Sequence, residues 1–240
     1  KMKKSIFLLF VIFSNSQFFG QDMTGSQLLE KAIEYHDPHK NWATFSGTFN
    51  VTMKTPTKSD RNSIISLDLP NEYFHLFAAQ DKTSYQYTLQ DQKCNINFNG
   101  HIATEEEKTA NKLSCERAKM YQNYYTYLYG LPMKLKDAGT IIHEKVAPKK
   151  FKGKDYLVLK VSYEKEVGED TWYFYFDPST YAMEVYQFYH EEEKNDGEFI
   201  LLSGLETVNG IKLPKERAWY YNKESKYLGT DFLITRQRYD

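Results

Sequence analysis

The sequence predicts a mainly β protein of the α+β class, in which antiparallel strands form a sandwich or barrel beside two helices. From residue 139 onward, strand-like runs are separated by turn dipeptides such as Asn209-Gly210, and this regular spacing favours hairpins. Two other segments, near residues 24–36 and 105–129, repeat apolar residues at helical period. No helical pattern interrupts the strands after residue 139, so parallel βαβ units are not expected.

The first residues have the three-part pattern of a secretory signal. A lysine-rich start precedes an apolar run over residues 6–13, and small and polar residues follow. The apolar run is shorter than the roughly 20 residues that span a bilayer. We expect residues 1–20 to be a cleaved signal peptide and residues 21–240 to form a single β domain. No cysteine lies near the expected cleavage site, so a lipid anchor is not expected and the protein is predicted to be periplasmic or secreted.

The composition is that of a folded domain. Hydrophobic residues make up 41% of the chain and aromatic residues 16%, with 20 tyrosines, which is enough for a core. The 31 basic and 32 acidic residues are interspersed and give a net charge of −1. A basic patch for nucleic acid is therefore not expected. No further apolar run is long enough for a transmembrane span, and the sequence identifies no protein partner.

The chain has two cysteines, Cys94 and Cys115. An oxidising compartment permits a disulfide between them, which would close a loop of about 20 residues and contribute about 3 kcal/mol. The alternative is a pair of buried thiols that pack as small apolar residues. The disulfide is our prediction.

The segment TGSQLLEKAIEYHDP is predicted to be the first helix. Thr24 and Gln27 have the spacing of a capping box, in which two side chains satisfy free backbone groups of the first turn. Asp37-Pro38 ends the helix, because proline disfavours helical backbone in the residue before it. The expected apolar stripe comprises Leu28, Leu29, Ala32, Ile33 and Tyr35 or His36.

Residues 41–103 are predicted to form strands. Apolar and aromatic runs such as TFSGTFNVTMK and EYFHLFAA carry this pattern. Pro70-Asn71 marks a turn inside the block, and Asn99-Gly100 closes it with a favoured hairpin dipeptide.

The second helix is predicted over residues 105–129. Thr104 and Glu107 form another capping box, and three glutamates load the first turn with negative charge that suits the positive helix end. Gly130 stands where a C-terminal cap belongs, and Pro132 follows as a stop. Tyrosines at 121, 124, 125, 127 and 129 widen the apolar face beyond one core-facing stripe.

Several strands after residue 139 are apolar on both faces. In TWYFYF, Trp172 and Phe174 point to one side while Tyr173 and Tyr175 point to the other. A sheet wetted on one side would alternate more cleanly with polar residues. Something must cover the second face, and the helix at 105–129 is the expected cover.

The motifs YHDPHKNW, NYYTYLYGLPMKLKDAGT, YFDPSTYAMEVYQFYH and LETVNGIKLPKERAWYYN resemble a family of exported proteins of Gram-negative bacteria with no assigned function. The element order resembles the periplasmic lipoprotein carriers of the LolA/LolB type. That resemblance implies a curved antiparallel half-barrel of about eleven strands, with an N-terminal helix and an inserted plug helix at about 105–129. In those carriers the acyl chains lie between barrel and helices. The resemblance supplies no catalytic residues.

Two polar clusters are candidates for chemistry. His36, Asp37 and His39 lie at a helix end, and we interpret them as the end of the apolar stripe and a solvated turn rather than a metal site. His190 precedes Glu191, Glu192 and Glu193, which we interpret as a hairpin tip, because adjacent residues of a strand point to opposite faces. No familiar catalytic motif occurs, so no enzyme, metal or cofactor is predicted.

The leading hypothesis is a periplasmic, noncatalytic binding or carrier protein for a lipid, an acyl chain or another amphipathic ligand. The ligand would lie between the curved sheet and the aromatic helix, where tyrosine hydroxyls could orient a headgroup. The predicted ligand-binding residues are Tyr121, Tyr124, Tyr125, Leu128, Trp172, Phe174, Tyr186 and Phe188.

Two alternatives stay open. The helix could fill the barrel with its own side chains, which would leave an envelope protein-interaction or structural module with a filled core. A weaker alternative is a carbohydrate-binding or hydrolytic protein, because stacked aromatic rings suit sugars, and hydrolysis would need two converging carboxylates.

Overall fold

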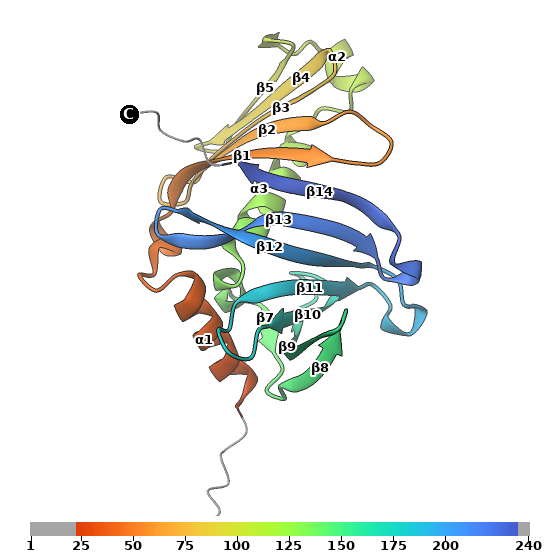
Figure 1. Ribbon diagram of the computed structural model, residues 1–240. Coiled ribbons are helices and arrows are strands. Elements are labelled where there is room, and N and C mark those ends of the chain that lie inside the picture. The colour runs from red at the N-terminus through yellow and green to blue at the C-terminus, as the bar shows by residue number, and fades with distance from the viewer. Residues whose placement is uncertain (1–22, 235–240) are drawn as a thin grey trace, which may run out of the picture.

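The computed structural model describes residues 23–234, and within them the chain forms one open 14-stranded sheet with three α-helices (Figure 1). The predicted signal peptide lies outside the described residues. The helices are α1 (Gly25–His36), α2 (Glu105–Ala110) and α3 (Cys115–Gly130). The strands before α2 are β1 (Ser46–Lys54), β2 (Arg61–Asp68), β3 (Tyr73–Gln80), β4 (Thr83–Gln90), β5 (Lys93–Phe98) and β6 (His101–Ile102). The strands after α3 are β7 (Thr140–Ile142), β8 (Ala147–Phe151), β9 (Lys154–Tyr163), β10 (Thr171–Phe176), β11 (Met183–Tyr189), β12 (Glu198–Val208), β13 (Ile211–Tyr221) and β14 (Tyr227–Ile234).

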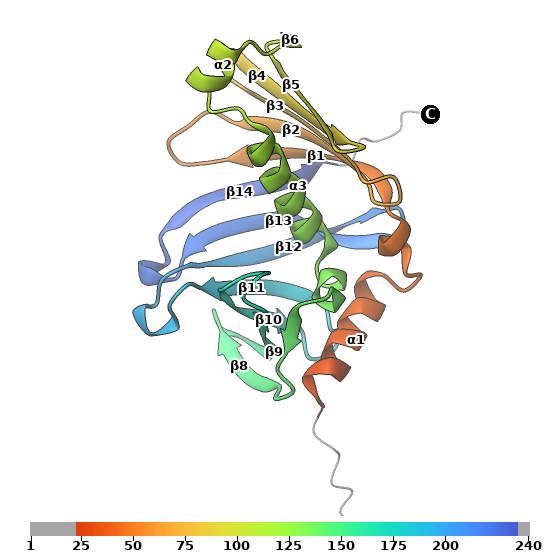
Figure 2. The same ribbon diagram turned by 180° about the vertical axis from the view of Figure 1, so that it is seen from behind.

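The sheet is antiparallel throughout and does not close. Its order is β6-β5-β4-β3-β2-β1-β14-β13-β12-β11-β10-β9-β7, with β8 pairing with β9 beyond this path. The first and last strands meet where β1 pairs with β14, and the two outer ends, β6 and β7, stay apart. The curved antiparallel half-barrel with an N-terminal helix and a helix across its inside is therefore confirmed (Figure 2).

Helix α1 forms as its sequence predicts. Thr24 accepts a hydrogen bond from the backbone N–H of Gln27, and the Gln27 side chain accepts one from the N–H of Thr24, so the capping box is complete. The helix ends at His36, immediately before Asp37-Pro38. Its stripe packs against β9 and β13 at the lower end of the sheet (Figure 1).

The prediction of a single helix over residues 105–129 is wrong in one respect, because this segment forms two helices. Residues 111–114 separate α2 from α3, and Lys112 in this break has a left-handed backbone (φ 54°). Ser114 starts the second helix by accepting a hydrogen bond from the N–H of Arg117. The Cys94–Cys115 disulfide is present, and it holds the first residue of α3 against β5.

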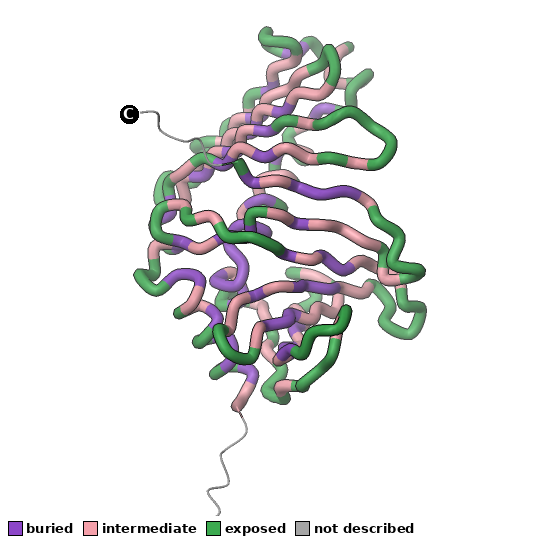
Figure 3. The backbone as a smooth tube through the Cα atoms, viewed as in Figure 1, coloured by how far each residue is buried: buried purple, intermediate pink, exposed green. Residues whose placement is uncertain are grey.

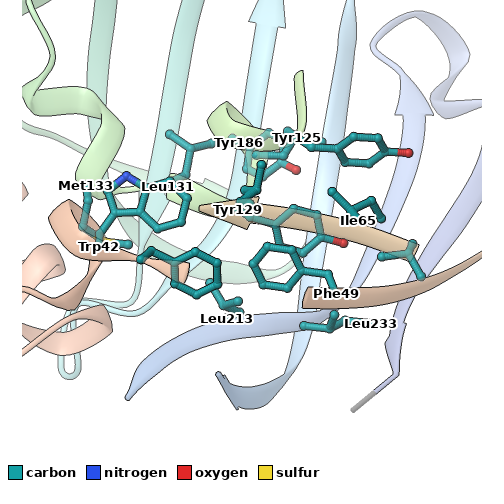
Figure 4. Packing of buried hydrophobic residues seen from close by; sticks show 14 of the residues in the cluster. Trp42, Phe49, Ile65, Tyr125, Tyr129, Leu131, Met133, Tyr186, Leu213 and Leu233 are labelled. Atoms are coloured by element: carbon teal, nitrogen blue, oxygen red, sulfur yellow. The ribbon is translucent and has the colours of Figure 1, made fainter. Parts of the chain in front are cut away.

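Helix α3 crosses the concave face of the sheet and carries much of the core (Figure 2). Tyr129 stacks on Phe49 of β1 with ring centroids 4.1 Å apart, and Tyr125 and Leu128 are buried beside it (Figure 4). Buried stretches lie along the strands, whereas the hairpin tips are exposed (Figure 3). Burial of apolar surface stabilises the folded state by about 25 cal/mol per Å², and the buried side chains of α3 therefore hold this helix in the half-barrel.

Gly130 does not act as the expected left-handed cap. It is the last residue of α3, and the extended Leu131 follows it. A Cβ on Gly130 would lie 2.5 Å from Cζ2 of Trp42, in the 3₁₀ turn Asn41–Thr44. Glycine is therefore needed here for the close approach of the helix end to this indole ring.

The outer face of the sheet has a cover of its own, and it is not the expected helix. Tyr156, Val158, Tyr175 and Val185 form a separate buried cluster on that face. Phe151 of β8 packs on Tyr175 at 5.1 Å, and Lys149 donates a hydrogen bond to its hydroxyl. The aromatic residues of β10 therefore alternate between two cores, one packed under α3 and one packed under β8.

Candidate functional site

Aromatic rings on the concave face form a connected surface, which we call the aromatic band. On the sheet, Trp172 lies 4.8 Å from Phe188, 5.9 Å from Phe174 and 6.2 Å from Tyr186, measured between ring centroids. Tyr186 in turn lies 6.3 Å from Trp219 of β13. With two tyrosines of α3, the band comprises Tyr124, Tyr127, Trp172, Phe174, Tyr186, Phe188 and Trp219.

Helix α3 meets the sheet part of this band at two points. Tyr124 stacks on Trp219 at 6.4 Å, and Tyr127 packs edge-on against Trp172 at 5.6 Å. The hydroxyl of Tyr127 is hydrogen-bonded to that of Tyr163 on β9. Tyr124 is 39% exposed, so the band reaches solvent beside the helix.

A second group of tyrosines lies nearer the start of α3. Tyr121 is within 6.5 Å of the rings of Tyr85, Tyr87 and Tyr125. Its hydroxyl accepts hydrogen bonds from the Tyr85 hydroxyl and from the guanidinium of Arg117. Tyr125 also contacts Tyr124 at 5.1 Å, which connects this group to the aromatic band.

The tyrosine hydroxyls of this region differ in acidity. Burial raises the pKa of Tyr125 to about 12. The pKa of Tyr121 is lowered, because the hydrogen bonds from Tyr85 and Arg117 outweigh a burial effect that acts the other way. These hydroxyls can donate or accept hydrogen bonds to a polar group of a ligand.

A cleft of about 900 Å³ runs along α3. Its sheet wall comes from the ends of β2, β4 and β5, with Leu67, Leu89 and Cys94 among the lining residues. Its helix wall includes Gln122 and Thr126. Helix α3 therefore does not fill the half-barrel completely. The cleft is wide enough for a ligand of the size that protein pockets commonly hold.

The eight predicted ligand-binding residues fall into distinct places. Trp172, Phe174, Tyr186, Phe188 and Tyr124 come together in the aromatic band, although Phe174 and Tyr186 are fully buried. Tyr121 belongs to the second tyrosine group, while Tyr125 and Leu128 are buried between α3 and the sheet. Of the eight, only Tyr124 also lines the cleft within the described residues.

Sequence reasoning missed three residues of this region. Tyr127 and Trp219 complete the aromatic band, and Arg217 is buried beneath α3. Trp219 stands in an aromatic strand-like run with Tyr220 and Tyr221, a signal that could have found it, whereas nothing in the sequence marks Arg217 as buried. The sequence does not reveal that the side chains of Arg217 and Trp219 both contact α3.

The polar clusters considered for chemistry have structural partners. Both ring nitrogens of His36 are hydrogen-bonded to backbone groups, and Asp37 accepts from the N–H groups of Asn41 and Trp42. His190 pairs with Asp170 at 2.6 Å on the surface. Glu192 accepts a hydrogen bond from Tyr173. Residues 23–234 contain no group of three or more side chains placed to hold a metal ion.

Helices in the described part of the chain are all too short or too polar to cross a membrane. Comparison of the sequence with family profiles finds a match over residues 3–236 to a family of unknown function, DUF6503. Comparison with curated proteins finds no match.

Three solved structures are similar at low sequence identity. A LolA superfamily protein from Nitrosomonas europaea is 12% identical, with a TM-score of 0.49 over 88% of this chain and 92% of that one. A domain described as an outer membrane lipoprotein-sorting protein from Vibrio parahaemolyticus is 12% identical, with a TM-score of 0.47 over 90% and 94%. A DUF1329 family protein from Desulfovibrio piger is 10% identical, with a TM-score of 0.49 over 88% and 91%.

Proposed function

We propose that this chain, which belongs to the DUF6503 family of unknown function, is a noncatalytic periplasmic carrier that binds an amphipathic ligand between α3 and the curved sheet. The observation that carries the proposal is the aromatic band. It runs from α3 onto β10, β11 and β13, and it reaches solvent at Tyr124. The cleft along α3 supports it, because the helix leaves room in the half-barrel.

The binding mechanism would be burial of apolar surface, with specificity from polar groups at the border of the band. Rings bury large apolar areas at little cost in side-chain entropy, and a hydroxyl at the ring edge can orient a headgroup. Tyr124 combines both features, because its ring stacks on Trp219 while part of its surface stays exposed. A lipid or acyl chain fits this chemistry.

Uptake of a neutral fluorescent probe, N-phenyl-1-naphthylamine, together with native mass spectrometry tests the proposal. We expect saturable binding, displacement by fatty acids, and a bound amphiphile in protein purified from a bacterial envelope. Tyr124→Ala should weaken binding about fivefold, since an aromatic pair contributes about 1 kcal/mol. Tyr227→Ala is the matched control, because Tyr227 is also 39% exposed but contacts Tyr220 on the other face of the sheet.

A clean apo mass and no saturable probe uptake would contradict the proposal. That result would favour the alternative of a protein-interaction module with a filled core. Crosslinking in envelope extracts would then be expected to capture a protein partner in place of a lipid.

A further inference from the structure

A row of charged side chains lies across the sheet beneath α3. Arg217 of β13 is the direct register partner of Asp231 of β14. Asp231 is the partner of Met53 of β1, and Met53 is the partner of Arg61 of β2. Directly opposed residues in antiparallel strands point to the same face. That face is the concave one, because the Arg217 guanidinium lies 4.3 Å from the ring centroid of Tyr129 on α3.

Arg217 is buried with most of its hydrogen-bonding capacity unused. Its side chain is 1% exposed, and Nη1 donates to the carbonyl of Pro214 at 3.2 Å. Among the described residues, Nε and Nη2 have no hydrogen-bond partner. The buried hydroxyl of Tyr186 forms no well-aligned hydrogen bond either, although it faces Arg217 closely enough for the charge and a weak hydrogen bond of that arginine to oppose the rise that burial causes in the pKa of Tyr186. Buried polar groups in native proteins are nearly always paired. Asp231 Oδ1 is also without a partner among the described residues and lies beyond 4 Å from both guanidinium groups, so the free donors of Arg217 need an acceptor that can reach them.

The charge of the row is also unbalanced. Two arginines face one carboxylate, and neither arginine forms an ion pair within 4 Å in residues 23–234. The Nε of Arg61 is a further buried donor without a partner. Burial raises the pKa of Asp231, and the charges of Arg61 and Arg217 oppose this shift. An anion would neutralise the row and accept hydrogen bonds from both guanidinium groups.

The row adjoins the aromatic band. Trp219 follows Arg217 by two residues in β13 and contacts Tyr124 and Tyr186. A ligand lying on the band with its polar end toward Arg217 would therefore place its headgroup among the free donors. Figure 4 shows Tyr125, Tyr129 and Tyr186 gathered in the same buried region.

We propose that Arg217 and Arg61 form a binding site for the anionic headgroup, a carboxylate or a phosphate, of an amphiphile whose chain lies on the aromatic band. This inference rests on the proposed carrier function and names the class of its ligand. Arginine suits both headgroups, because its planar fork matches their paired oxygens.

The test compares ligands that share a chain and differ in headgroup. Displacement of N-phenyl-1-naphthylamine from the delipidated protein is measured with dodecanoate, dodecyl phosphate and dodecanol at pH 7.5. Both anionic ligands should bind at least about tenfold more tightly than dodecanol, as charge-assisted hydrogen bonds predict. Acetate and inorganic phosphate, which lack the chain, should not displace the probe at the same concentrations.

Three variants assign the preference to the row. Arg217→Gln and Arg61→Gln should each lower the dodecanoate-to-dodecanol affinity ratio toward one, because dodecanoate affinity falls more than dodecanol affinity. Asp231→Asn should raise dodecanoate affinity, because it removes the carboxylate that repels an anion. Lys82→Gln is the control, since it removes one positive charge from the exposed β3–β4 turn. If Arg217→Gln does not fold, Arg61→Gln at the half-buried end of the row and Asp231→Asn decide the question.

Three outcomes would overturn the headgroup site. These are an affinity ratio near one in the unaltered protein, a ratio that survives in the arginine variants, or equal displacement by the free anions. Tight dodecanol binding with no preference would remove only this site and leave the carrier proposal standing. Loss of all displacement would remove both.

Discussion

At the scale of single residues, His36 shows how a candidate ligand can serve the fold. Its Nδ1 donates to the carbonyl of Lys212 on β13 at 2.7 Å, and its Nε2 accepts from the N–H of Met183 on β11 at 2.9 Å. Since Nε2 must accept, the ring is neutral. Burial lowers the pKa of His36 to about 4; the Lys212 carbonyl opposes this shift, and the Lys212 ammonium adds to it.

This arrangement predicts a loss of stability in mild acid. Above pH 6.5 the ring is neutral in both states and contributes no pH dependence. As the pH falls from about 6.5 to about 4, His36 binds a proton in the unfolded chain but not in the folded chain. The free energy of unfolding should drop by about 3 kcal/mol over this window and level off below it. Urea unfolding at several pH values measures the drop.

The control variants separate this histidine from other groups. His36→Gln should flatten the pH dependence between 6.5 and 4, even if it is less stable overall. His190→Gln should instead steepen the loss of stability in acid, because the hydrogen bond that His190 donates to Asp170 raises the pKa of His190 and stabilises the fold at low pH. Identical slopes for the His36 variant and the unaltered protein would contradict the assignment.

The candidate site was predictable where residue type alone carries the signal. Aromatic runs at 121–129, 172–176 and 186–188 mark the rings that line the concave face. Arg217 was not predictable, because nothing local distinguishes a buried arginine from a solvated one in PKERAWYY. Its role depends on register with Asp231 and on a helix almost 90 residues earlier, and both are tertiary facts.

At the scale of elements, most boundaries follow from local chemistry. The two capping boxes start α1 and α2 as expected, and Asp37-Pro38 ends α1. The break before α3 was missed because the helical apolar period continues through it, although Ser114 is a usable cap. Strands β6 and β8 were missed as well. The first has two residues, and the second is an edge strand whose exposed lysines show no alternation.

The disulfide connects two elements that are separated in the sequence. It joins β5 to the first residue of α3, with a sequence separation of 21. Reduction should lower the free energy of unfolding by about 3 kcal/mol, as loop-closure entropy predicts. It should also speed amide exchange in the first turns of α3. Urea unfolding and hydrogen exchange, with and without dithiothreitol, measure both effects.

Replacing both cysteines provides the matched control. The Cys94→Ala, Cys115→Ala variant should match the reduced protein in stability and show no response to reductant. An unchanged denaturation midpoint, with both thiols shown to be free by alkylation, would mean that packing alone positions the start of α3.

At the scale of the whole molecule, the strand pairing of the open sheet and the packing of α3 both stabilise the fold. The two halves of the sheet pair with each other only at β1 and β14, and α3 adds a second connection across the concave face. It contacts β4 and β5 at one end and the aromatic band at the other. The β8 cluster stabilises the outer face independently.

The separation of the inner and outer faces predicts which segments a bound ligand will protect from amide exchange. A ligand at 100 times its dissociation constant stabilises the folded state by about 2.7 kcal/mol. Saturating dodecanoate should therefore slow amide exchange in α3, β10, β11 and β13, while β8 exchanges at its unliganded rate. Hydrogen exchange with mass spectrometry on the same sample resolves these segments. Uniform protection would indicate global stabilisation without a local site, and protection confined to β8 would place the ligand on the outer face and contradict binding under α3.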